Sequence, residues 1–267
     1  MTGSDLSIVD THAHLDMKDF DKDREEVIAR ALNAGVNTII TVGTGLESSK
    51  KAIGLAERYP QILAAVGIHP HDTGLVKKSD IANLAEIAKH PKVVAIGETG
   101  LDFYRNYAPR DKQIEVLKWQ LDLAVELNLP IIIHCRQAEK DMLSLLRNWT
   151  LNNKSQLGQS RGVIHCFSGD GNAARQYLDM GFYLSLAGYI GYPASRNAQS
   201  VIRDIPHNRL LVETDCPFLP PQAYRSQRNE PAYVALTAGV LAKIREVPLE
   251  TVARETTQNA LRLFSRK

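Results

Sequence analysis

Two histidines stand two positions apart near the start of the chain, within the sequence DTHAHLD (10–16). The apolar, β-branched stretch before them predicts a strand, and residues two apart on a strand point to the same side. His12 and His14 would therefore reach toward one place, with Asp10 in phase with them but one step deeper. Such a pair could fill a core, hold a metal ion or bind an anion, and the pair alone does not distinguish between these three roles.

Ionisable residues also end other apolar runs of the chain. Six of the eight runs that resemble strands close on such groups, which beyond the first pair are His69, Glu98, His134, His165, Glu213 and Asp215. A lone histidine at a strand end is more often a hydrogen-bonded core residue than a ligand. Several strands at once would bury a cluster of charges without compensation, which is costly, and a metal ion supplies that compensation.

The candidate ligands favour certain metal ions. Imidazole and carboxylate groups suit Zn²⁺ and related divalent ions, and the sequence has no set of four cysteines. The groups outnumber what one tetrahedral ion needs, so we expect two divalent ions, with Zn²⁺, Mg²⁺ and Mn²⁺ as candidates. Glu98 lies centrally among the strands and is the natural shared ligand. Two such ions can activate water and stabilise both the entering and the leaving oxygen of a phosphodiester.

Three cysteines each directly follow a candidate ligand: Cys135, Cys166 and Cys216. Because neighbours on a strand face opposite sides, we expect Cys135 and Cys166 to point toward surrounding helices as packing residues. A thiolate bound to zinc is the alternative. Their odd number and wide spacing favour a reduced compartment and argue against structural disulfides.

Positioning these residues requires strands that alternate with helices. Eight short apolar runs lie at 7–12, 38–43, 62–69, 93–98, 130–134, 162–166, 182–188 and 209–215. Helical patterns occupy 21–34, 47–59, 79–90, 110–128, 138–149, 172–180, 195–204, 231–245 and 248–264. Eight strand–helix units predict a closed (β/α)₈ TIM barrel with an additional C-terminal helix, and a doubly wound open sheet is the alternative. Barrel enzymes build their sites at the carboxyl ends of the strands.

Bulk properties fit one ordinary globular domain over residues 1–267. The chain has 267 residues, 44% hydrophobic and 23% charged, and a net charge of +2. The overall charge and composition therefore do not by themselves indicate binding to a nucleic acid or a membrane. An anionic substrate would have to be attracted by a local concentration of positive charge. We see no membrane span and no secretory signal, and we expect a cytoplasmic protein with no obligate protein partner.

The ordered motifs of the chain resemble one family. HAHLD, VGIHPH (66–71), IGETGLDFY (96–104), IIIHCR (131–136), HCFSG (165–169) and ETDCPFL (213–219) follow one another, and RNEP (228–231) and NALRLF (259–264) come after them. This combination, over nearly the whole chain, resembles the TatD family of metal-dependent deoxyribonucleases, which belongs to the amidohydrolase-type barrels. The strand end GETG carries no lysine, which argues against the barrels that use a carboxylated lysine as the shared ligand.

The resemblance implies a role for each site residue. One ion would be held by His12, His14, Glu98 and Asp215, and the other by Glu98, His134 and His165. Asp215 would accept a proton from water as general base, and His69 would contact the scissile phosphate. We expect Asp10 and Glu213 to orient ligand histidines by hydrogen bonds. Arg136, in phase with His134, is a candidate for substrate binding, as are Tyr104 and Arg228 in loops of the mouth, although a surface role is as well supported for each.

The function implied is hydrolysis of phosphodiester bonds in DNA by activated water, with cleavage from a chain end. The expected substrate is single-stranded or nicked DNA, and RNA or tRNA are further candidates. The alternative within this family is hydrolysis of the ester in D-aminoacyl-tRNA. A binding module that kept the barrel but lost the chemistry is the other alternative, which the complete set of candidate ligands opposes.

Overall fold

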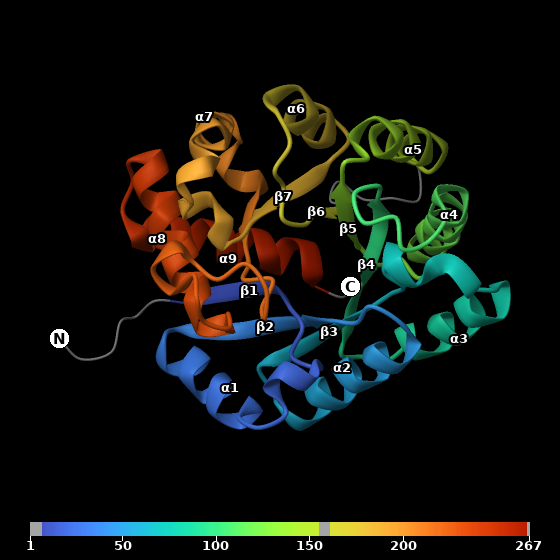
Figure 1. Cartoon of the computed structure of the whole chain (residues 1–267), viewed down its shortest axis with the longest axis horizontal. Coiled ribbons are helices and arrows are strands. Elements are labelled where there is room, and N and C mark those ends of the chain that lie inside the picture. The colour runs from blue at the N-terminus through green and yellow to red at the C-terminus, as the bar shows by residue number, and fades with distance from the viewer. Residues whose placement is uncertain (1–6, 155–160, 266–267) are drawn as a thin grey trace.

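The computed structural model describes residues 7–154 and 161–265, and the described strands form one parallel sheet. The strands are β1 (Ile8–Ala13), β2 (Val36–Val42), β3 (Ile62–Val66), β4 (Val93–Asp102), β5 (Ile131–Arg136), β6 (Gly162–Ile164), β7 (Phe182–Leu186) and β8 (Leu210–Val212). Each strand pairs with the next one along the chain, and helices surround them (Figure 1). The predicted (β/α)₈ barrel is confirmed, and the sequential strand order excludes the doubly wound alternative.

The strands are apolar on both sides because two separate layers pack against them. Val9, Ile40, Ile132, Val163 and Leu211 belong to the cluster that fills the inside of the barrel. Neighbouring residues on the same strands belong to a larger cluster shared with the helices. Continuous apolar runs are therefore required, as in other parallel sheets that are covered on both faces.

The barrel closes between its first and last strands at the end that carries the candidate ligands. Ala13 and Cys216 form an isolated parallel bridge. The His14 N–H donates to the Cys216 carbonyl at 2.8 Å, and the Asp215 N–H donates to the His12 carbonyl at 2.9 Å. The backbone that closes the barrel therefore also holds residues from both ends of the chain beside each other.

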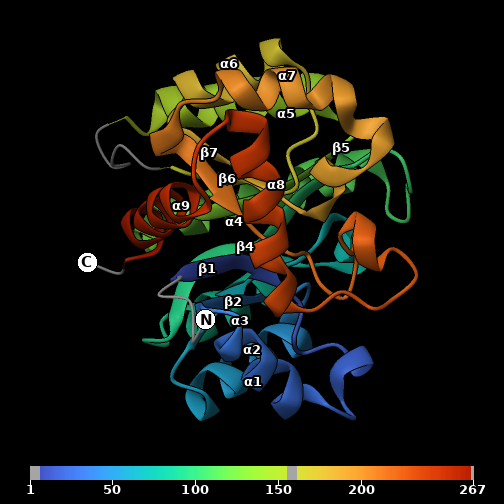
Figure 2. The same cartoon turned by 90° about the vertical axis from the view of Figure 1, so that its left-hand side faces the viewer.

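The surrounding helices are α1 (Arg24–Asn33), α2 (Leu46–Arg58), α3 (Lys78–Ala88), α4 (Arg110–Glu126), α5 (Glu139–Asn152), α6 (Gly171–Asp179), α7 (Arg196–Asp204), α8 (Val234–Arg245) and α9 (Leu249–Phe264). Figure 2 shows α8 and α9 on the side of the barrel near β1. The predicted additional C-terminal helix is α9, whose Ala260, Leu263 and Phe264 join the inner cluster. Within the described residues, none of the helices has the length and apolar character that a bilayer span requires.

The fourth strand is longer than the sequence pattern predicts. We expected it to end at Glu98, but β4 continues through Gly100 to Asp102. Gly100 has a φ of 151°, and a Cβ atom there would overlap the carbonyl oxygen of His134. Glycine at this position lets β4 lie close to β5, which brings Glu98 and Asp102 to one side of His134.

Candidate metal centre

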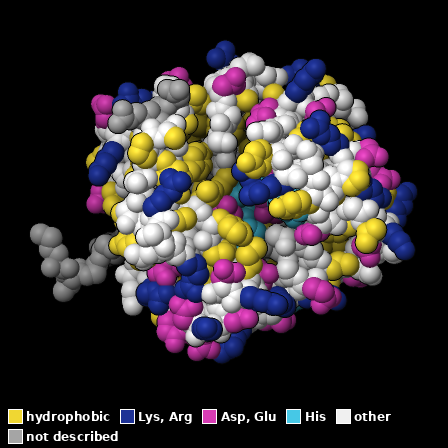
Figure 3. Space-filling view, in the orientation of Figure 1, with side chains coloured by type: hydrophobic (Ala, Val, Ile, Leu, Met, Phe, Trp, Pro, Cys, Tyr) yellow, Lys and Arg dark blue, Asp and Glu magenta, His cyan; other side chains and the backbone are white. Residues whose placement is uncertain are grey.

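A cavity of about 770 Å³ opens at the carboxyl ends of the strands. In the space-filling view, histidine side chains lie at the base of this hollow, with cationic and hydrophobic side chains around its rim (Figure 3). Its lining contains the predicted residues His14, His69, Glu98, His134, Arg136, His165 and Asp215. The volume is in the range of pockets that hold small molecules, so it suits a short piece of substrate.

The alternation of the strands explains why these side chains converge. Ile132 on β5 and Val163 on β6 face the inside of the barrel, and the histidines two residues later, His134 and His165, follow in phase. Glu213 follows Leu211 of β8 in the same way. Because all strands are parallel, these inward positions meet at one end of the barrel.

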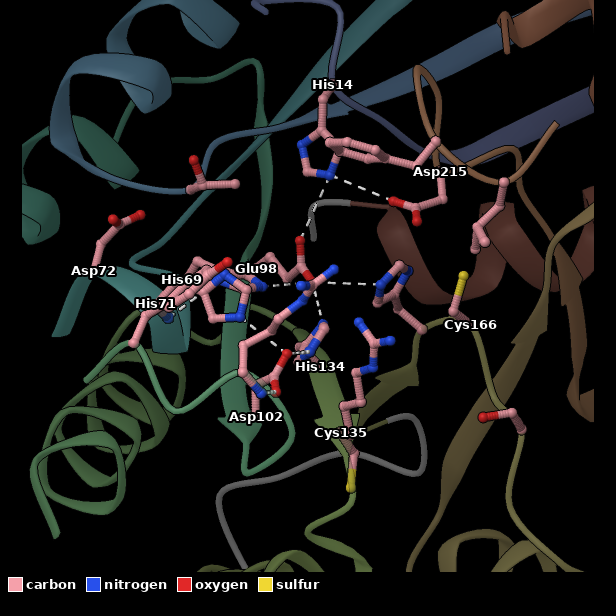
Figure 4. A pocket seen from close by; sticks show the side chains of 18 of the residues that line it. His14, His69, His71, Asp72, Glu98, Asp102, His134, Cys135, Cys166 and Asp215 are labelled. Carbon is pink, nitrogen blue, oxygen red and sulfur yellow. Dashed lines mark hydrogen bonds and ion pairs between the residues drawn. The ribbon is translucent and has the colours of Figure 1, made fainter. Parts of the chain in front are cut away.

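Glu98 lies at the centre of the cluster, and its two carboxylate oxygens face different groups of histidines (Figure 4). Oε2 is 3.3 Å from His12 Nε2 and 3.6 Å from His14 Nε2. On the other side, Oε1 lies near three ring nitrogens: those of His134 at 2.8 Å, His165 at 3.3 Å and His69 at 3.5 Å. One carboxylate is thus shared between two sets of imidazoles.

Asp215 completes the side of the cluster that contains His12 and His14. Its Oδ1 is 3.5 Å from His14 Nε2 and 3.9 Å from His12 Nε2. The two histidine Nε2 atoms are themselves only 3.2 Å apart. We define the His12 half of the centre as His12, His14 and Asp215, and the His134 half as His134 and His165, with Glu98 common to both.

In the His134 half, the second nitrogen of each histidine ring meets a buried carboxylate. His165 Nδ1 lies 3.0 Å from Glu213 Oε1, and His134 Nε2 lies 3.3 Å from Asp102 Oδ2. Glu213 also accepts from the Cys166 N–H at 2.6 Å. Carboxylates in this position orient a metal-binding imidazole and increase its basicity. The structure therefore brings Glu213 to the place that the sequence analysis gave it, and adds Asp102.

In the His12 half, the second ring nitrogens have weaker partners or none. His14 Nδ1 lies 2.8 Å from the carbonyl oxygen of Val42. Among the described residues, the buried Nδ1 of His12 has no hydrogen-bond partner. Asp10 does not reach either ring: its Oδ1 accepts from the backbone N–H groups of His12 at 3.3 Å and Thr214 at 2.9 Å. Asp10 therefore contacts the backbone of His12 and not its ring, and its Oδ2 also accepts from the Thr214 hydroxyl at 2.7 Å, so its role in orienting His12 stays a prediction.

The geometry and chemistry of the cluster fit divalent metal ions. Triads of donor atoms, such as those of His12, His14 and Glu98, lie within 4.8 Å of one another. His69, Glu98 and His134 form another such triad, so His69 is close enough to share the site that we predicted for its neighbours. Neutral imidazoles and carboxylates packed this closely are the donors that Zn²⁺ and similar ions prefer.

The charges of the cluster shift the pKa values of its members. Burial alone would raise the pKa of Glu98, but the charges of His165 and His69 and a hydrogen bond from His12 hold it well below its usual value. Burial opposes protonation of His14, yet Asp215 and Glu98 raise its pKa to about 9. Burial also opposes protonation of His134, whose pKa is raised by Asp102 and Glu98. Burial instead lowers the pKa values of His12 and His69, so the shifts differ in direction within the cluster.

One of the three predicted substrate residues lines the cavity, and a second one, Tyr104, lies beside it. Arg136 lines it, and its guanidinium carbon is 4.2 Å from the centre of the Tyr104 ring at the rim. Arg228 lies elsewhere: it donates to both oxygens of Asp23 at 2.8 and 2.7 Å and stacks on Phe20. This position favours anchoring of the loop after β8 over the predicted contact with substrate.

Sequence reasoning missed two residues and misplaced one. Asp102 and His71 were not singled out, although Asp102 Oδ2 also lies 2.9 Å from His71 Nε2 and both residues line the cavity. The signals were present, since His71 follows His69 by two residues and Asp102 lies on the extension of β4. Cys135 and Cys166 both line the cavity. The thiol of Cys135 accepts from the hydroxyl of Tyr177 in α6 at 3.7 Å, as expected for a residue that faces the helices, whereas the φ of 46° at Cys166 interrupts the strand alternation.

Comparisons with known proteins identify the family of this chain. Residues 9–265 match the family described as TatD related DNase. The chain is 42% identical to the uncharacterized metal-dependent hydrolase YabD of Bacillus subtilis, over 96% of this chain and 98% of that protein. It is 38% identical to the 3'-5' ssDNA/RNA exonuclease TatD of Cronobacter sakazakii, over 92% and 93% of the two chains. A solved structure, the TatD homolog YJJV from Escherichia coli K12, superimposes with a TM-score of 0.89 at 32% identity, over 97% and 98% of the chains. This protein therefore belongs to the TatD-related DNase family of metal-dependent hydrolases.

Proposed function

We propose that this chain is a phosphodiesterase that removes nucleotides from an end of single-stranded DNA with the help of two divalent ions. The position of Glu98 carries this proposal, because its two oxygens face separate groups of histidines. One ion would be held by His12, His14, Glu98 and Asp215, and the other by Glu98, His134 and His165. Divalent ions bound there supply Lewis acidity and lower the pKa of water.

The side chains of the chain then have defined tasks. Asp215 lines the cavity, and its carboxylate is positioned to accept the proton of the attacking water. His69 also lines the cavity, and it is held by the N–H of His71, which donates to its Nδ1 at 3.2 Å. Its Nε2 therefore points toward Glu98 and the substrate side, where it would contact an oxygen of the scissile phosphate.

The surroundings of the cavity support a single strand as the substrate. Tyr107 and Phe218 line the cavity with exposed fractions of 67% and 50%, and Tyr104, which is 51% exposed, lies beside the lining residue Arg136. Exposed rings offer stacking surfaces for unpaired bases, whatever their identity. A relative of this chain carries the name 3'-5' ssDNA/RNA exonuclease, which agrees with such a substrate. The fragment released would be a mononucleotide, or a short piece of that size.

The proposal is tested by removing and restoring metal while following digestion of end-labelled, single-stranded DNA. Chelation should abolish cleavage, and Mg²⁺, Mn²⁺ or Zn²⁺ should restore it with products that shorten stepwise from one end. Asp215→Asn should keep the fold and lose turnover, whereas Glu57→Gln on the surface of α2 is a matched control that should keep full activity. Cleavage that continues in excess chelator would contradict the two-ion proposal.

Parallel incubation with D-aminoacyl-tRNA separates the family alternative from DNA hydrolysis. Both reactions use activated water, so the metal dependence alone does not distinguish them. Loss of the aminoacyl group with intact DNA in the companion reaction would replace the proposed function with ester hydrolysis on tRNA. Digested DNA with intact aminoacyl-tRNA would support the proposal.

A further inference from the structure

Two arginines at the rim of the cavity lack an acidic partner. Arg105, which follows β4, and Arg136, at the end of β5, both line the cavity. Among the described residues, neither guanidinium forms an ion pair or a side-chain hydrogen bond. Both instead lie over the ring of Tyr104, at 4.2 Å for Arg136 and 5.5 Å for Arg105 from the ring centre. The ring positions two positive charges without neutralising them.

Two arginines near the loop after β8, Arg228 and Arg30, behave differently. Arg228 pairs with Asp23, and Arg30 donates to both oxygens of Glu230 at distances of 3.0, 3.1 and 2.6 Å. These cations have their anions within the chain. Arg105 and Arg136 lie over the same ring without an anionic partner in the chain. Their mutual repulsion is unfavourable until a ligand supplies negative charge. Planar guanidinium groups suit phosphate in particular, because they donate two parallel hydrogen bonds.

One buried carboxylate fixes the position of this pair relative to the metal centre. Asp102 Oδ1 accepts from the backbone N–H groups of Tyr104 at 3.0 Å and Arg105 at 2.8 Å. Its Oδ2 faces His134 Nε2 at 3.3 Å. Arg136 stands two residues beyond His134 on β5, a rise of about 6.6 Å along a strand. The two cations are therefore held one step farther out than the histidine, toward solvent.

We propose that Arg105, Tyr104 and Arg136 form a subsite for a second phosphate of the nucleic acid, adjacent along the strand to the phosphate that is cleaved. The inference rests on the proposed phosphodiester hydrolysis and specifies its substrate: a chain with at least two neighbouring phosphates, not an isolated phosphodiester. The two guanidinium groups bind the flanking phosphate, and the exposed Tyr104 ring beside them supports a base. Asp102 sets the distance between this subsite and the centre where cleavage takes place.

The test uses thymidine trinucleotides in which one of the two linkages is a neutral methylphosphonate. Each of the two isomers has one cleavable bond, with a neutral neighbour on its 5' or its 3' side. For the wild-type protein loaded with metal, kcat/KM should fall roughly 10- to 100-fold in one isomer relative to the fully charged trinucleotide, the loss of a charge-assisted hydrogen bond. The isomer affected identifies the side on which the subsite lies.

Variants then connect this loss to the arginines. Arg105→Gln and Arg136→Gln should lower kcat/KM for the charged trinucleotide by a similar factor, but change it less than twofold for the affected neutral isomer. Arg110→Gln is the matched control, because Arg110 is an exposed arginine that stacks on Phe103 but does not line the cavity. Equal loss on charged and neutral substrates, or no discrimination by the wild type, would overturn the subsite.

A binding measurement without metal separates this inference from the proposed function. Fluorescence anisotropy of a labelled oligothymidylate in chelator should show that each arginine variant reduces the salt dependence of binding, by about 0.7 in the slope of log K against log salt. An unchanged slope in both variants would overturn the subsite even if hydrolysis occurs. If no linkage is cleaved under any metal condition, the proposed function fails, while a reduced slope would still support the phosphate subsite.

Discussion

The two halves of the metal centre contain similar histidines that are supported in different ways. In the His134 half, both rings rest against buried carboxylates, Asp102 and Glu213. In the His12 half, one ring rests against a backbone carbonyl and the Nδ1 of His12 has no partner among the described residues. Glu98 faces both halves.

This difference bears on how tightly each half holds an ion. A carboxylate behind an imidazole fixes the ring and makes it a better donor, whereas a carbonyl fixes the ring without adding negative charge. We therefore expect the His134 half to bind its ion more tightly and to fill first. The His12 half, which includes the proposed base Asp215, would exchange its ion more readily. Substitutions in either half, and first of all at Glu98, should therefore affect the two ions to different degrees.

Replacing Glu98 should have the largest effect, because both halves lose a ligand. Glu98→Gln keeps the size of the side chain but removes the charge that faces His12 and His134. We expect kcat/KM for single-stranded DNA to fall by more than about 100-fold, beyond the loss typical for a partner that only orients a ligand. Metal analysis should show fewer than two ions per chain. A variant that retains two ions and normal turnover would show that Glu98 is not a shared ligand.

Replacing the carboxylates behind the rings should affect one half selectively. In a chelator competition, Glu213→Gln and Asp102→Asn should each lower the affinity for the ion in the His134 half by about 10- to 100-fold. The affinity for the ion in the His12 half should remain nearly unchanged.

The matched control for these two variants is Asp10→Asn. Burial raises the pKa of Asp10 to about 8, and this group contacts backbone N–H groups and the Thr214 hydroxyl instead of an imidazole ring. We expect its metal affinities to change less than about threefold. If Asp10→Asn weakened binding as much as Glu213→Gln does, the proposed asymmetry would be lost.

Proton release gives a measure of the same asymmetry without mutation. Burial opposes protonation of His165, but the charges of Cys166, Glu213 and Glu98 raise its pKa well above its usual value, and the pKa of His134 is raised as well. In the other half the pKa of His14 is raised to about 9, but that of His12 is lowered by burial and the charge of His165. At pH 7 the first ion should therefore displace more protons than the second.

Calorimetric titrations in buffers of different ionisation enthalpy measure the number of protons released. Because raised pKa values mean that metal competes with protons, affinity should increase as the pH rises from 6 toward 9, and proton release should decline above pH 9. The free energy that protonated His14 contributes to the metal-free fold is present below pH 6.5 and is lost as the pH passes about 9. Equal proton release for the two ions would contradict the ordering of the halves.

The sequence predicted the barrel and the residues that meet at its mouth because both depend on local patterns. Apolar runs define the strands, and a polar residue in phase with such a run, as His134 is with Ile132, must point inward. The pattern fails where the backbone departs from regular alternation. Asp102 lies beyond the predicted strand end, and Cys166 has a positive φ.

Local sequence patterns also could not predict ion pairs between residues that are far apart in the chain. Nothing near Arg228 in the chain indicates that Asp23, more than 200 residues earlier, will take up its charge. A basic residue in a mouth loop is compatible with binding substrate or with fastening the loop, and the fold decides by placing an acid within reach. The same reasoning identifies Arg105 and Arg136 as different, since no acid of the described chain forms an ion pair with either guanidinium group, and both groups lie over the Tyr104 ring.

The smallest effect is expected at Arg228, which supports only the His12 half. The loop that follows Asp215 is fastened by Asn229, whose side-chain amide donates to the carbonyls of Thr214 at 2.8 Å and Phe218 at 2.6 Å. Arg228 connects the end of this loop to α1 through Asp23. Arg228→Gln should lower the free energy of unfolding by about 1 kcal/mol in urea, as for a partly exposed ion pair. It should change kcat/KM less than twofold and should slightly weaken the binding of the ion in the His12 half alone. A tenfold rise in KM for oligonucleotides with unchanged stability would instead place Arg228 in contact with substrate, and the mouth would then bind nucleic acid on both sides.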